Sequence, residues 1–477
     1  MTDLNDSAGV SVEVGRGERV TTGDIAARID RLPLTRIQYS YSSITQWFWG
    51  IMIAADGLVA SLYPYIWAPK GLISSFQFDM LLGSNIGVGI LIGEYLGGFL
   101  SDMIGRKWTL ILSALIEGLF IWPIALTNSF GWLLLWNVLF ALGMGMLLSV
   151  HAVYIHEMAP PQHRQKLTLR VQTIAPISAG LLAGLTSFYW MPVHYQWFVY
   201  TLSAAPIVLC IPVGIFLMPE SPRWLEGKGR VEAANKIVTR WEERTEKITG
   251  QPLSPPALSR HTIIQTERVP AMEVFGGKYR TRTLVLFAVW FFGYSGIVYG
   301  GASFFPTYAV ASGWTPHLLF GVLRLLAVPI ILIAFFAVSA IGERIERKTW
   351  LLISSGVYSL AFLLLFAVPH SVPGQVVLVS LATPFASIWL FTTYNYTAAA
   401  YPTRVRSVGT GWTDGVGHLG TIVGTSLLVG RLFAWTAAHG YYGWILYVTI
   451  AGAILPSIIL AKWGMNQKSG ILEELST

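Results

Sequence analysis

Long apolar segments constrain this chain more than any other feature of its sequence. Twelve of them recur, each long enough for a helix of about 20 residues that crosses a bilayer. They occupy residues 46–68, 80–100, 108–127, 130–153, 168–190, 196–218, 283–311, 317–341, 349–369, 374–398, 408–432 and 443–463. Charged residues make up only 12% of the chain, about half their share in a soluble domain. The sequence therefore predicts an all-α integral membrane protein with twelve transmembrane helices.

The positive charges indicate how the chain is oriented. The net charge is +7, but Lys and Arg concentrate in the tails and in alternate loops, as the positive-inside rule describes. A nucleic-acid surface would instead gather them on one soluble face. We expect a multi-pass protein of the cell (inner) membrane, with both termini in the cytoplasm and no nucleic-acid partner. Residues 1–45 lack the apolar core of a signal peptide, so we expect the first apolar segment to stay in the membrane.

The sequence favours transport over catalysis. No constellation for a metal, a nucleotide or a catalytic nucleophile is present, and the single cysteine, Cys210, rules out an intramolecular disulfide. The ATP-binding pattern GxxxxGK[ST] is absent. We therefore expect no cofactor and no enzymatic activity.

A polar stretch divides the apolar segments six and six. Its first part, GRVEAANKIVTRWEERTEKI, has apolar residues at helical spacing opposite a charged face, which predicts an amphipathic surface helix. The expected organisation is an N-terminal cytoplasmic tail (1–45), a first six-helix bundle (46–218), a cytoplasmic linker with that helix (219–281), a second six-helix bundle (282–463) and a cytoplasmic tail (464–477).

An internal repeat supports this division. The stretch GGFLSDMIGRKW (97–108) is echoed by SAIGERIERKTW (339–350), and EMAPPQHR (157–164) is echoed by AAYPTRVR (399–406). The two offsets, 241 and 242 residues, agree. Two pseudo-symmetric bundles of six helices suit alternating access to a site at their interface.

Several of these motifs resemble one transporter family. Gly98-FLSDMIG-Arg106-Lys107, Pro219-ESPRWL, Tyr401-PTRVR, Leu32-PLTR and Gly470-ILEEL are together similar to motifs of the major facilitator superfamily, in particular metabolite:proton symporters, sugar porters and organic-ion transporters. The resemblance covers nearly the whole chain. It implies a monomeric secondary transporter whose partners are a small-molecule substrate, protons and the lipid bilayer.

The repeated loop motif predicts a cytoplasmic gate. A carboxylate at one helix end and basic residues one turn later are able to bridge neighbouring helices. The candidates are Asp102, Arg106, Lys107, Glu157, Arg164, Glu343, Arg347 and Arg406. In the second half, Ala399 stands where the acid is expected and Glu346 where a glycine is expected, so we expect gates of unequal strength. The alternative is that these charges only set the membrane topology.

The substrate class is predicted from the seventh apolar segment, residues 283–311. Sugar porters carry amide side chains there, whereas this chain has Phe292, Gly293 and Val298, so we disfavour a sugar even though Gln172 matches a sugar-porter glutamine. Aromatic residues replace the amides, which suits a flat organic molecule, although they could equally serve packing. The candidate substrate-binding residues are Gln172, Trp290, Tyr294, Tyr299, Arg324, Trp389, Tyr394 and His418.

Ionisable residues within the apolar segments are functional candidates. Asp56 lies about 15 Å into helix 1 and resembles the helix 1 acid of metabolite:proton symporters; we expect it to carry the proton and to pass it to Glu94 or to the Asp414/His418 pair. A neutral, hydrogen-bonded acid is the alternative at each position. Arg324 is expected to pair with Asp414, with carbonyl groups or with an anionic substrate.

These expectations combine into one functional prediction. The chain is predicted to be a proton-coupled symporter of a small organic metabolite, more specifically an organic or aromatic acid. Efflux of an amphipathic compound, sugar transport and a non-transporting nutrient sensor are the alternatives.

Overall fold

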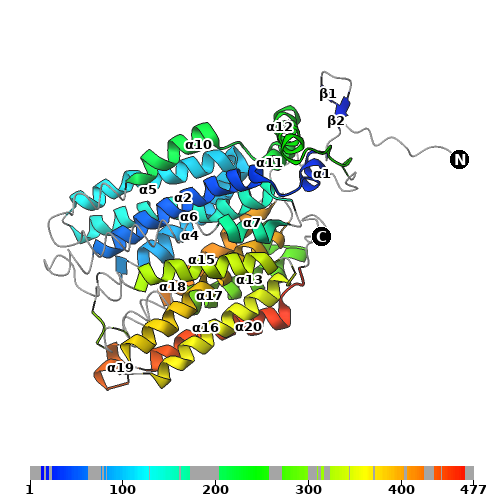
Figure 1. The fold of residues 1–477 in the computed structure, drawn as a ribbon. Coiled ribbons are helices and arrows are strands. Elements are labelled where there is room, and N and C mark those ends of the chain that lie inside the picture. The colour runs from blue at the N-terminus through cyan, green and yellow to red at the C-terminus, as the bar shows by residue number, and fades with distance from the viewer. Residues whose placement is uncertain are drawn as a thin grey trace.

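The fold consists almost entirely of helices. A computed structural model describes residues 12–14, 18–20, 24–62, 77, 80–81, 83–127, 129–160, 163–171, 204–256, 271–298, 309, 313–315, 323–342, 344–368, 371–401, 405–423, 434–441 and 443–467. Two short strands, β1 (Val12–Val14) and β2 (Glu18–Val20), pair antiparallel near the N-terminus and stand apart from the helices (Figure 1).

The first bundle is built from the N-terminal half. Its elements are α2 (Arg36–Leu62), the π-helical segment η2 (Gly83–Gly89), α4 (Ile90–Ile104), α5 (Arg106–Leu126), α6 (Phe130–Met158), α7 (Arg164–Val171), the π-helical segment η5 (Pro206–Cys210) and α10 (Ile211–Leu217). Helix α2 starts at Arg36, well before the predicted start at residue 46. The helix extends into the polar tail, where hydropathy gives no signal, and the backbone N–H of Tyr39 bonds to the carbonyl of Thr35.

The second bundle repeats this arrangement. It contains α13 (Arg280–Gly293), the π-helical segment η8 (Tyr294–Val298), α15 (Leu323–Ile341), α16 (Arg347–Leu364), η11 (Leu365–Ala367), α17 (Val372–Ala399), α18 (Arg406–Ile422) and α20 (Trp444–Trp463). A short helix, α19 (Ala434–Ala438), lies at one end of the bundle. Helical structure falls within each of the twelve apolar segments that the sequence predicts.

The helices have the dimensions of membrane spans. Seven helical stretches among the described residues are long and apolar enough to cross a bilayer: Gly83–Ile104, Arg106–Ile124, Phe130–Met158, Arg280–Val298, Arg347–Ala367, Val372–Ala399 and Leu446–Trp463. Pro206–Leu217 and Leu325–Ile341 are shorter apolar helices. Many large apolar side chains, such as Phe216 and Ile333, remain exposed on the outside of the bundles, as a lipid-facing surface requires.

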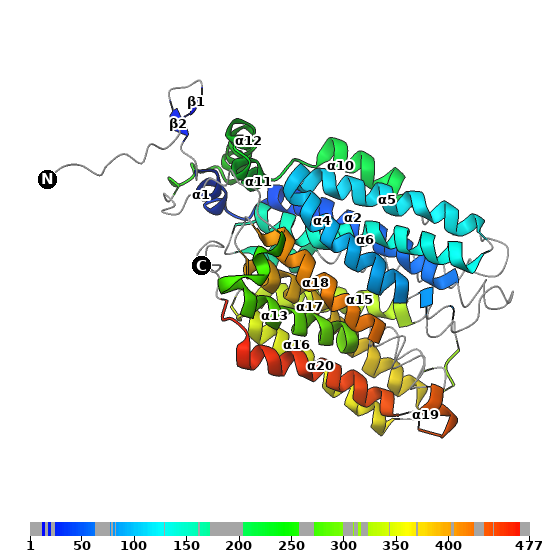
Figure 2. The same ribbon diagram turned by 180° about the vertical axis from the view of Figure 1, so that it is seen from behind.

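The two bundles lie side by side with their helices running in similar directions (Figures 1 and 2). Helix α4 of the first bundle lies directly against α18 of the second. A Cβ atom at Gly98 would lie 2.7 Å from the carbonyl oxygen of Ser407, and one at Gly411 would lie 2.6 Å from that of Glu94. The backbones of α4 and α18 therefore touch at these glycines, in the way that small residues allow membrane helices to approach.

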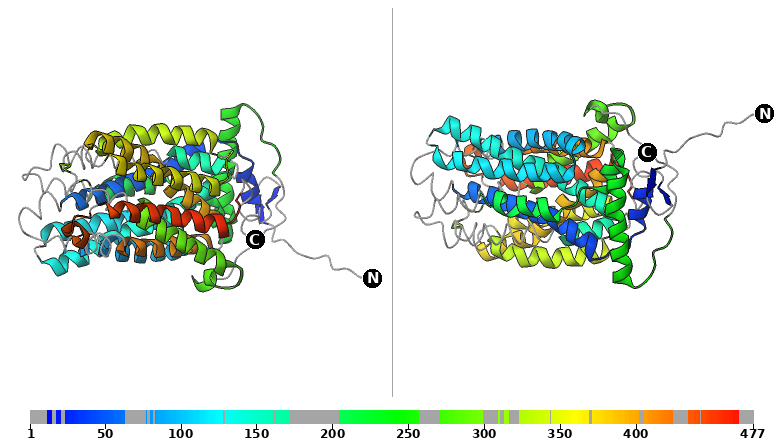
Figure 3. Two further views of the ribbon diagram at one scale, coloured as in Figure 1. Left: turned by 90° about the horizontal axis from the view of Figure 1, so that it is seen from below. Right: turned by 90° about the horizontal axis from the view of Figure 1, so that it is seen from above.

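One end of the bundles is covered by three short elements. These are α1 (Asp24–Asp30), α11 (Pro222–Gly227) and α12 (Val231–Thr249), and α12 lies across the bundle end (Figure 3). We call this end the α12 face. Helix α12 buries Ala234, Val238 and Trp241 and turns its charged side outward, and Trp241 stacks on Tyr41 with 5.4 Å between ring centroids. The amphipathic pattern of this segment therefore forms a surface helix.

Candidate functional site

Four of the predicted aromatic side chains come together between the bundles. Trp290, Tyr294, Trp389 and Tyr394 are all buried. The ring centroid of Trp290 lies 4.8 Å from that of Tyr394 and 6.0 Å from that of Trp389. The indole nitrogen of Trp290 donates a hydrogen bond of 3.0 Å to Thr397 Oγ1. These residues, on α13, η8 and α17, supply the second bundle's share of an aromatic cluster.

The first bundle completes this aromatic cluster with two residues that the sequence prediction missed. Trp49 on α2 packs edge-on against Phe391, with centroids 4.6 Å apart, and against His151 on α6 at 4.7 Å. His151 in turn lies 5.0 Å from Tyr394. A signal for Trp49 was available, since it precedes Asp56 by seven residues and so shares its helix face.

Two features of the aromatic cluster bear on what it binds. Trp389 lies over Gly293, where a Cβ atom would come within 1.9 Å of its ring, so its indole fills the space of any side chain at that position. The indole N–H groups of Trp49 and Trp389 are buried and have no hydrogen-bond acceptor within the described part of the chain. An indole nitrogen is a donor only. The aromatic cluster therefore offers two donors, one from each bundle.

Three predicted ionisable residues form a second cluster across the same interface. Glu94 lies on α4, and Asp414 and His418 lie one turn apart on α18. All three are fully buried, and one ligand atom from each lies within 4.8 Å of the other two. Glu94 Oε1 is 3.3 Å from His418 Nε2. We call these residues the acid–histidine cluster.

Tyr294 joins the two clusters. Its hydroxyl donates a hydrogen bond of 2.5 Å to Asp414 Oδ1 and lies 3.2 Å from the hydroxyl of Tyr394. Since the Tyr294 proton is used toward Asp414, Tyr394 is the donor in the second bond. The ring of Tyr294 also stacks on His418, with centroids 4.3 Å apart. A change in the packing of Tyr294 therefore reaches the carboxyl of Asp414 directly.

Asp56 has Asn85 as its hydrogen-bond partner in the structure, and the transfer of its proton to Glu94 or to the Asp414/His418 pair stays a prediction. The carboxylate accepts a hydrogen bond of 3.4 Å from the amide of Asn85 on η2, and among the described residues Glu94, Asp414 and His418 are not its hydrogen-bond partners. Asn85 also donates to Asn137 Oδ1 at 3.2 Å, and Asn137 donates to the carbonyl of Leu81 at 2.8 Å. The choice of partner depends on helix rotation within the first bundle, which an apolar segment does not specify.

Glu117 is a further buried acid of the first bundle. It lies on α5 with no exposed surface, and neither of its carboxylate oxygens is hydrogen-bonded to the described residues. Asp56 is close enough to interact with it electrostatically. The backbone of Gly143 on α6 packs directly on it, since a Cβ atom there would lie 2.7 Å from the Glu117 Cβ.

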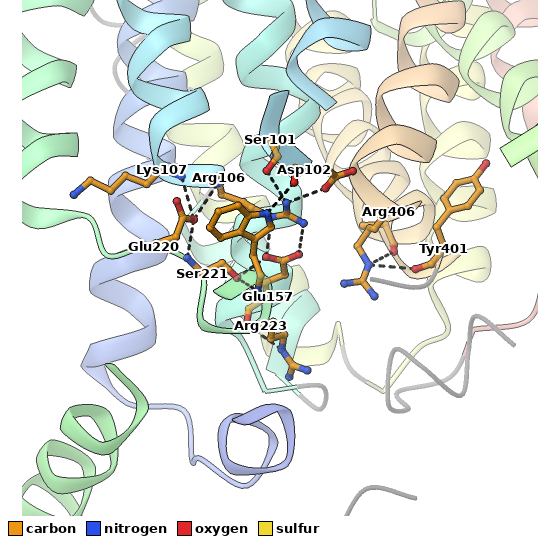
Figure 4. Close-up of polar contacts among 12 residues, drawn as sticks. Ser101, Asp102, Arg106, Lys107, Glu157, Glu220, Ser221, Arg223, Tyr401 and Arg406 are labelled. Carbon is orange, nitrogen blue, oxygen red and sulfur yellow. Dashed lines mark hydrogen bonds and ion pairs between the residues drawn. The ribbon is translucent and has the colours of Figure 1, made fainter. Parts of the chain in front are cut away.

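The predicted gate residues of the first bundle form one buried network at the α12 face (Figure 4). Arg106 holds both oxygens of Glu157, with NH2–Oε1 at 2.8 Å and Nε–Oε2 at 3.0 Å, and its NH1 reaches Asp102 Oδ1 at 2.8 Å. Ser221 donates to Glu157 Oε2 at 2.5 Å. The side chain of Lys107 points away and donates to the carbonyl of Ile215, while its backbone N–H donates to Glu220 Oε1 at 3.4 Å. The bidentate pair of Arg106 and Glu157 ties the start of α5 to the end of α6.

Glu220 is a member of the network that the site prediction did not include. Its Oε1 accepts hydrogen bonds from the backbone N–H groups of Arg106 at 2.9 Å and Ser221 at 2.8 Å, so the carboxylate sits at the N-terminus of α5. Burial raises the pKa of Glu220, although these hydrogen bonds and Arg106 oppose the rise. Gly105 makes room, with φ 104° and only 2.1 Å between an added Cβ and Glu220 Oε2. The motif PESPR could have signalled this acid.

Two residues of the corresponding loop in the second bundle contact the neutral Gln467 among the described residues. Arg347 NH1 lies 3.4 Å from Gln467 Oε1, and the backbone N–H of Gln467 donates to Glu346 Oε1 at 2.8 Å. Ala399 is buried at the position equivalent to Glu157. Among the contacts that the structure describes here, no counterpart of the Arg106–Glu157 pair is formed.

Two arginines preserve the repeat in their hydrogen bonds. Arg164 Nε donates to the carbonyl of His156 at 3.3 Å, and Arg406 Nε donates to that of Ala398 at 3.0 Å. Both acceptors lie eight residues before the arginine. Each guanidinium therefore binds the end of the preceding long helix, α6 in the first bundle and α17 in the second.

The bundles touch each other at the α12 face. His156 Nε2 on α6 lies 2.6 Å from Asn395 Oδ1 on α17, and Thr168 on α7 donates to the same oxygen at 3.1 Å. Arg170 on α7 donates to Ser339 on α15 at 3.3 Å. The interface is therefore closed by polar contacts at this end.

Four predicted site residues cannot be placed. Gln172, Tyr299 and Glu343 lie outside the described residues, and for Arg324 only the backbone, on α15, is described.

Comparisons with known proteins identify the family. The model of the family described as Major Facilitator Superfamily matches residues 50–425. A Bacillus subtilis protein provisionally named metabolite transport protein YyaJ is 29% identical over 457 residues, which are 92% of this chain and 95% of the relative. The niacin transporter NiaP of Acinetobacter baylyi is 24% identical over 446 residues, which are 91% and 97% of the two chains.

A solved structure supports the fold. The proton:xylose symporter XylE, bound to 6-bromo-6-deoxy-D-glucose, superposes with a TM-score of 0.70 at 18% identity, over 95% of this chain and 99% of that chain. Together with the family match, this confirms the predicted fold class of twelve transmembrane helices in two six-helix bundles.

Proposed function

Because the chain belongs to the major facilitator superfamily, we propose that this transporter is a proton-coupled symporter of a small organic acid with a flat or aromatic body. The transport of metabolites or sugars follows from the family and from its relatives. The proton, the acid and the aromatic body are the proposal. Rocking of the two bundles would expose the interface alternately to the two sides of the membrane.

The observation that carries the proposal is the bond between the two clusters. The aromatic cluster and the acid–histidine cluster share Tyr294, which stacks on His418 and donates to Asp414. A substrate that enters the aromatic cluster must displace or repack side chains that touch Tyr294. Such a movement changes the hydrogen bonding of Asp414, and through it the proton affinity of the cluster. This is the physical requirement for coupling.

The substrate class is inferred from the chemistry of the aromatic cluster. Two buried indole donors without acceptors, on Trp49 and Trp389, suit a ligand that brings acceptors, such as a carboxylate or a ring nitrogen. Flat rings are preferred by an aromatic surface. At Gly293, where sugar porters carry an amide side chain, the ring of Trp389 fills the space of a side chain. This counts against a sugar. That a relative is named a niacin transporter is consistent with this class.

The acid–histidine cluster is proposed to hold the transported proton. Two carboxyl groups this close repel each other unless a proton is shared or His418 is positively charged. Glu94 comes from the first bundle and the other two residues from the second, so the proton also affects how the bundles meet. Asp56, held by Asn85, is proposed as a second protonation site on the substrate's path, and Gln172, Tyr299 and Arg324 remain proposed substrate ligands.

The membrane and the orientation are part of the same proposal. We place the protein in the cell (inner) membrane as a monomer, with the α12 face in the cytoplasm. The described contacts at that face, including His156 with Asn395, then correspond to a state closed toward the cytoplasm.

Uptake into proteoliposomes tests the function. With an inward proton gradient, labelled niacin should accumulate above its equilibrium level, and labelled xylose should not. Tyr294→Phe keeps the ring stacking but removes the bond to Asp414, so we expect it to abolish gradient-driven accumulation while substrate exchange without a gradient continues. Tyr358→Phe is the matched control, since its hydroxyl is also buried but binds the carbonyl of Gly296.

The two halves of the proposal fail separately. Accumulation of xylose instead of niacin would refute the substrate class. Accumulation of niacin that is indifferent to the proton gradient, or to Tyr294→Phe, would refute the coupling.

A further inference from the structure

The geometry of the acid–histidine cluster is unusual for hydrogen bonding. Glu94 Oε1 and His418 Nε2 lie 3.3 Å apart, yet they form an ion-pair contact only and not a hydrogen bond. Both oxygens of Glu94 and Oδ2 of Asp414 are buried without an N–H or hydroxyl donor among the described residues, and the two carboxyl groups are close enough to hydrogen-bond to each other when one is protonated. Buried carboxylate oxygens normally find a donor or a cation. Carboxylate oxygens from the two bundles therefore gather beside the imidazole of His418.

One distance in this cluster equals a ligand–ligand separation in a metal coordination sphere, and the other two are bounded at 4.8 Å. Ligands about 2.0–2.2 Å from a tetrahedral zinc ion lie about 3.3–3.6 Å from each other. The measured separation of Glu94 Oε1 and His418 Nε2 is 3.3 Å, and the ligand atoms of all three residues lie within 4.8 Å of one another. One imidazole and two carboxylates are a donor set that suits divalent first-row transition metals.

The surroundings hold these donors in position. The hydroxyl of Tyr294 binds Asp414 Oδ1, which leaves Oδ2 directed elsewhere, and its ring stacks on the imidazole of His418. Outer hydrogen bonds of this kind orient metal ligands. Gly415, one residue after Asp414, leaves space for the Glu94 carboxylate, since an added Cβ atom would lie 3.0 Å from its Oε2.

We propose that Glu94, Asp414 and His418 form a binding site for a divalent first-row transition metal ion, such as Zn²⁺, that bridges the two bundles. An ion bound there joins α4 to α18, and the bundles then cannot separate without losing a ligand. Occupation of the site therefore arrests alternating access and inhibits transport. This role goes beyond the proposed symport, in which the same three residues exchange only protons.

Binding of zinc to the purified full-length protein, without a histidine tag, is the direct test. We expect one saturable site by calorimetry, and a rise in thermal stability with Zn²⁺ concentration, because an ion that binds only the folded state stabilises it. Co²⁺ should give visible absorption bands typical of low-symmetry coordination. Zn²⁺ should also inhibit exchange of labelled niacin in proteoliposomes, and a chelator should restore it.

Variants locate the site. Glu94→Gln and His418→Gln should each weaken zinc binding by about tenfold or more. Loss of a residue that only orients a ligand already costs this much, and loss of the ligand itself should cost at least as much. Gly415→Ala keeps all three ligands but crowds Glu94 Oε2, so it should weaken binding as well. Glu117→Gln, a buried acid outside the cluster, and His163→Gln, a histidine outside the bundles, should bind zinc like the wild type.

The outcomes separate this inference from the proposed function. Absence of saturable zinc binding, or binding unchanged in both Glu94→Gln and His418→Gln, overturns the metal site. Proton-driven uptake in chelator-treated buffer would then still support the symport. Conversely, zinc binding that depends on these residues supports the metal site even if no proton-driven uptake is found.

Discussion

The two bundles keep the same positions at the α12 face but not the same chemistry. In the first bundle, Arg106 holds the buried carboxylate of Glu157 with two hydrogen bonds. In the second, the equivalent Arg347 contacts the amide of Gln467, and Ala399 replaces the acid. The backbone contacts of Arg164 and Arg406 are nevertheless the same. The repeat therefore conserves how the backbone holds Arg164 and Arg406, while the second half has Ala399 in place of the buried acid that pairs with Arg106.

This difference implies unequal rigidity. Breaking a buried ion pair leaves an uncompensated charge, whereas loss of a neutral hydrogen bond to an arginine is much less costly. We expect the first bundle to keep its structure at the α12 face through the transport cycle, and the second bundle to supply most of the movement there. Four predictions, in order of expected effect, test the comparison.

Removal of the buried acid should have the largest effect. Glu157→Ala leaves Arg106 buried without its bidentate partner, and we expect it to lower the free energy of unfolding by about 3–5 kcal/mol. Gln467→Ala, which removes the neutral contact of Arg347, should cost about 1 kcal/mol. Denaturant unfolding in detergent measures both, and equal losses in the two variants would contradict the comparison.

The glycine of the loop motif should matter only in the first bundle. Gly105 has φ 104° and ψ 165°, a conformation that is essentially restricted to glycine, so Gly105→Ala should cost about 1–3 kcal/mol. Its equivalent, Glu346, has φ −59° and ψ 140°, which any residue adopts. Glu346→Ala should therefore lose no more than its bond to Gln467. Thermal unfolding of the two variants side by side checks this, and a cheaper Gly105→Ala would argue against backbone strain.

The helix cap of α11 also belongs to the network. Ser221 accepts a hydrogen bond from Trp224 N and donates one to Glu157, so Ser221→Ala should cost about 1–2 kcal/mol. Ser371 caps α17 by accepting from Gly374 N and has no such carboxylate contact. Ser371→Ala should therefore be milder, at about 1 kcal/mol or less. Equal shifts of the unfolding midpoint in the two variants would show that only the caps matter.

The smallest effect concerns the attachment of α1 to α12 at the α12 face. Among the described residues, the second bundle has no equivalent of α1. Glu242 on α12 binds Arg28 and Arg31, with both contacts at 2.5 Å. Burial favours a higher pKa for Glu242, but the bonds from Arg28 and Arg31 outweigh it and the pKa is lowered below its ordinary value of 4.5. The contribution of these pairs is therefore complete above about pH 4.5 and is lost as the pH falls through the lower value in the folded protein.

Hydrogen exchange measures this attachment. The amides of Asp24–Asp30 should exchange faster as the pH falls below that range, after correction for the intrinsic rate, and Glu242→Gln should exchange fast at all pH values. The contribution is expected to stay below about 1 kcal/mol. If the exchange rates of the α1 amides changed neither with pH nor in Glu242→Gln, the apolar residues of α1 alone would hold it in place.

The sequence supplied most of the fold and part of the site. Hydropathy defines the helices, and the loop motif identifies Asp102, Arg106 and Glu157 because their spacing places them at helix ends. Glu94 was found by itself, and Asp414 and His418 were found as a pair four residues apart, since ionisable residues in apolar segments are conspicuous. Their assembly into one cluster was not predictable, because Glu94 and Asp414 belong to different bundles.

Contacts that depend on helix rotation were the ones missed. The partner of Asp56 proved to be Asn85, and asparagine in an apolar run attracts less attention than a charge. Trp49 and His151 were overlooked because an aromatic residue in a membrane helix usually serves packing or the interface. Their role emerges only where α2 and α6 meet α17.

The contact between α4 and α18 has a mechanical consequence. At Gly98 and Gly411 the two bundles meet through backbone atoms, without interlocking side chains. Side chains that interdigitate must change rotamers when one helix turns against another, and each change has its own barrier. The backbone contacts at these two glycines have few such barriers, although Tyr95 on α4 and Trp412 on α18 do pack against each other nearby, with ring centroids 4.9 Å apart. At these glycines the α4–α18 contact would thus offer little resistance when the two halves of the molecule move against each other.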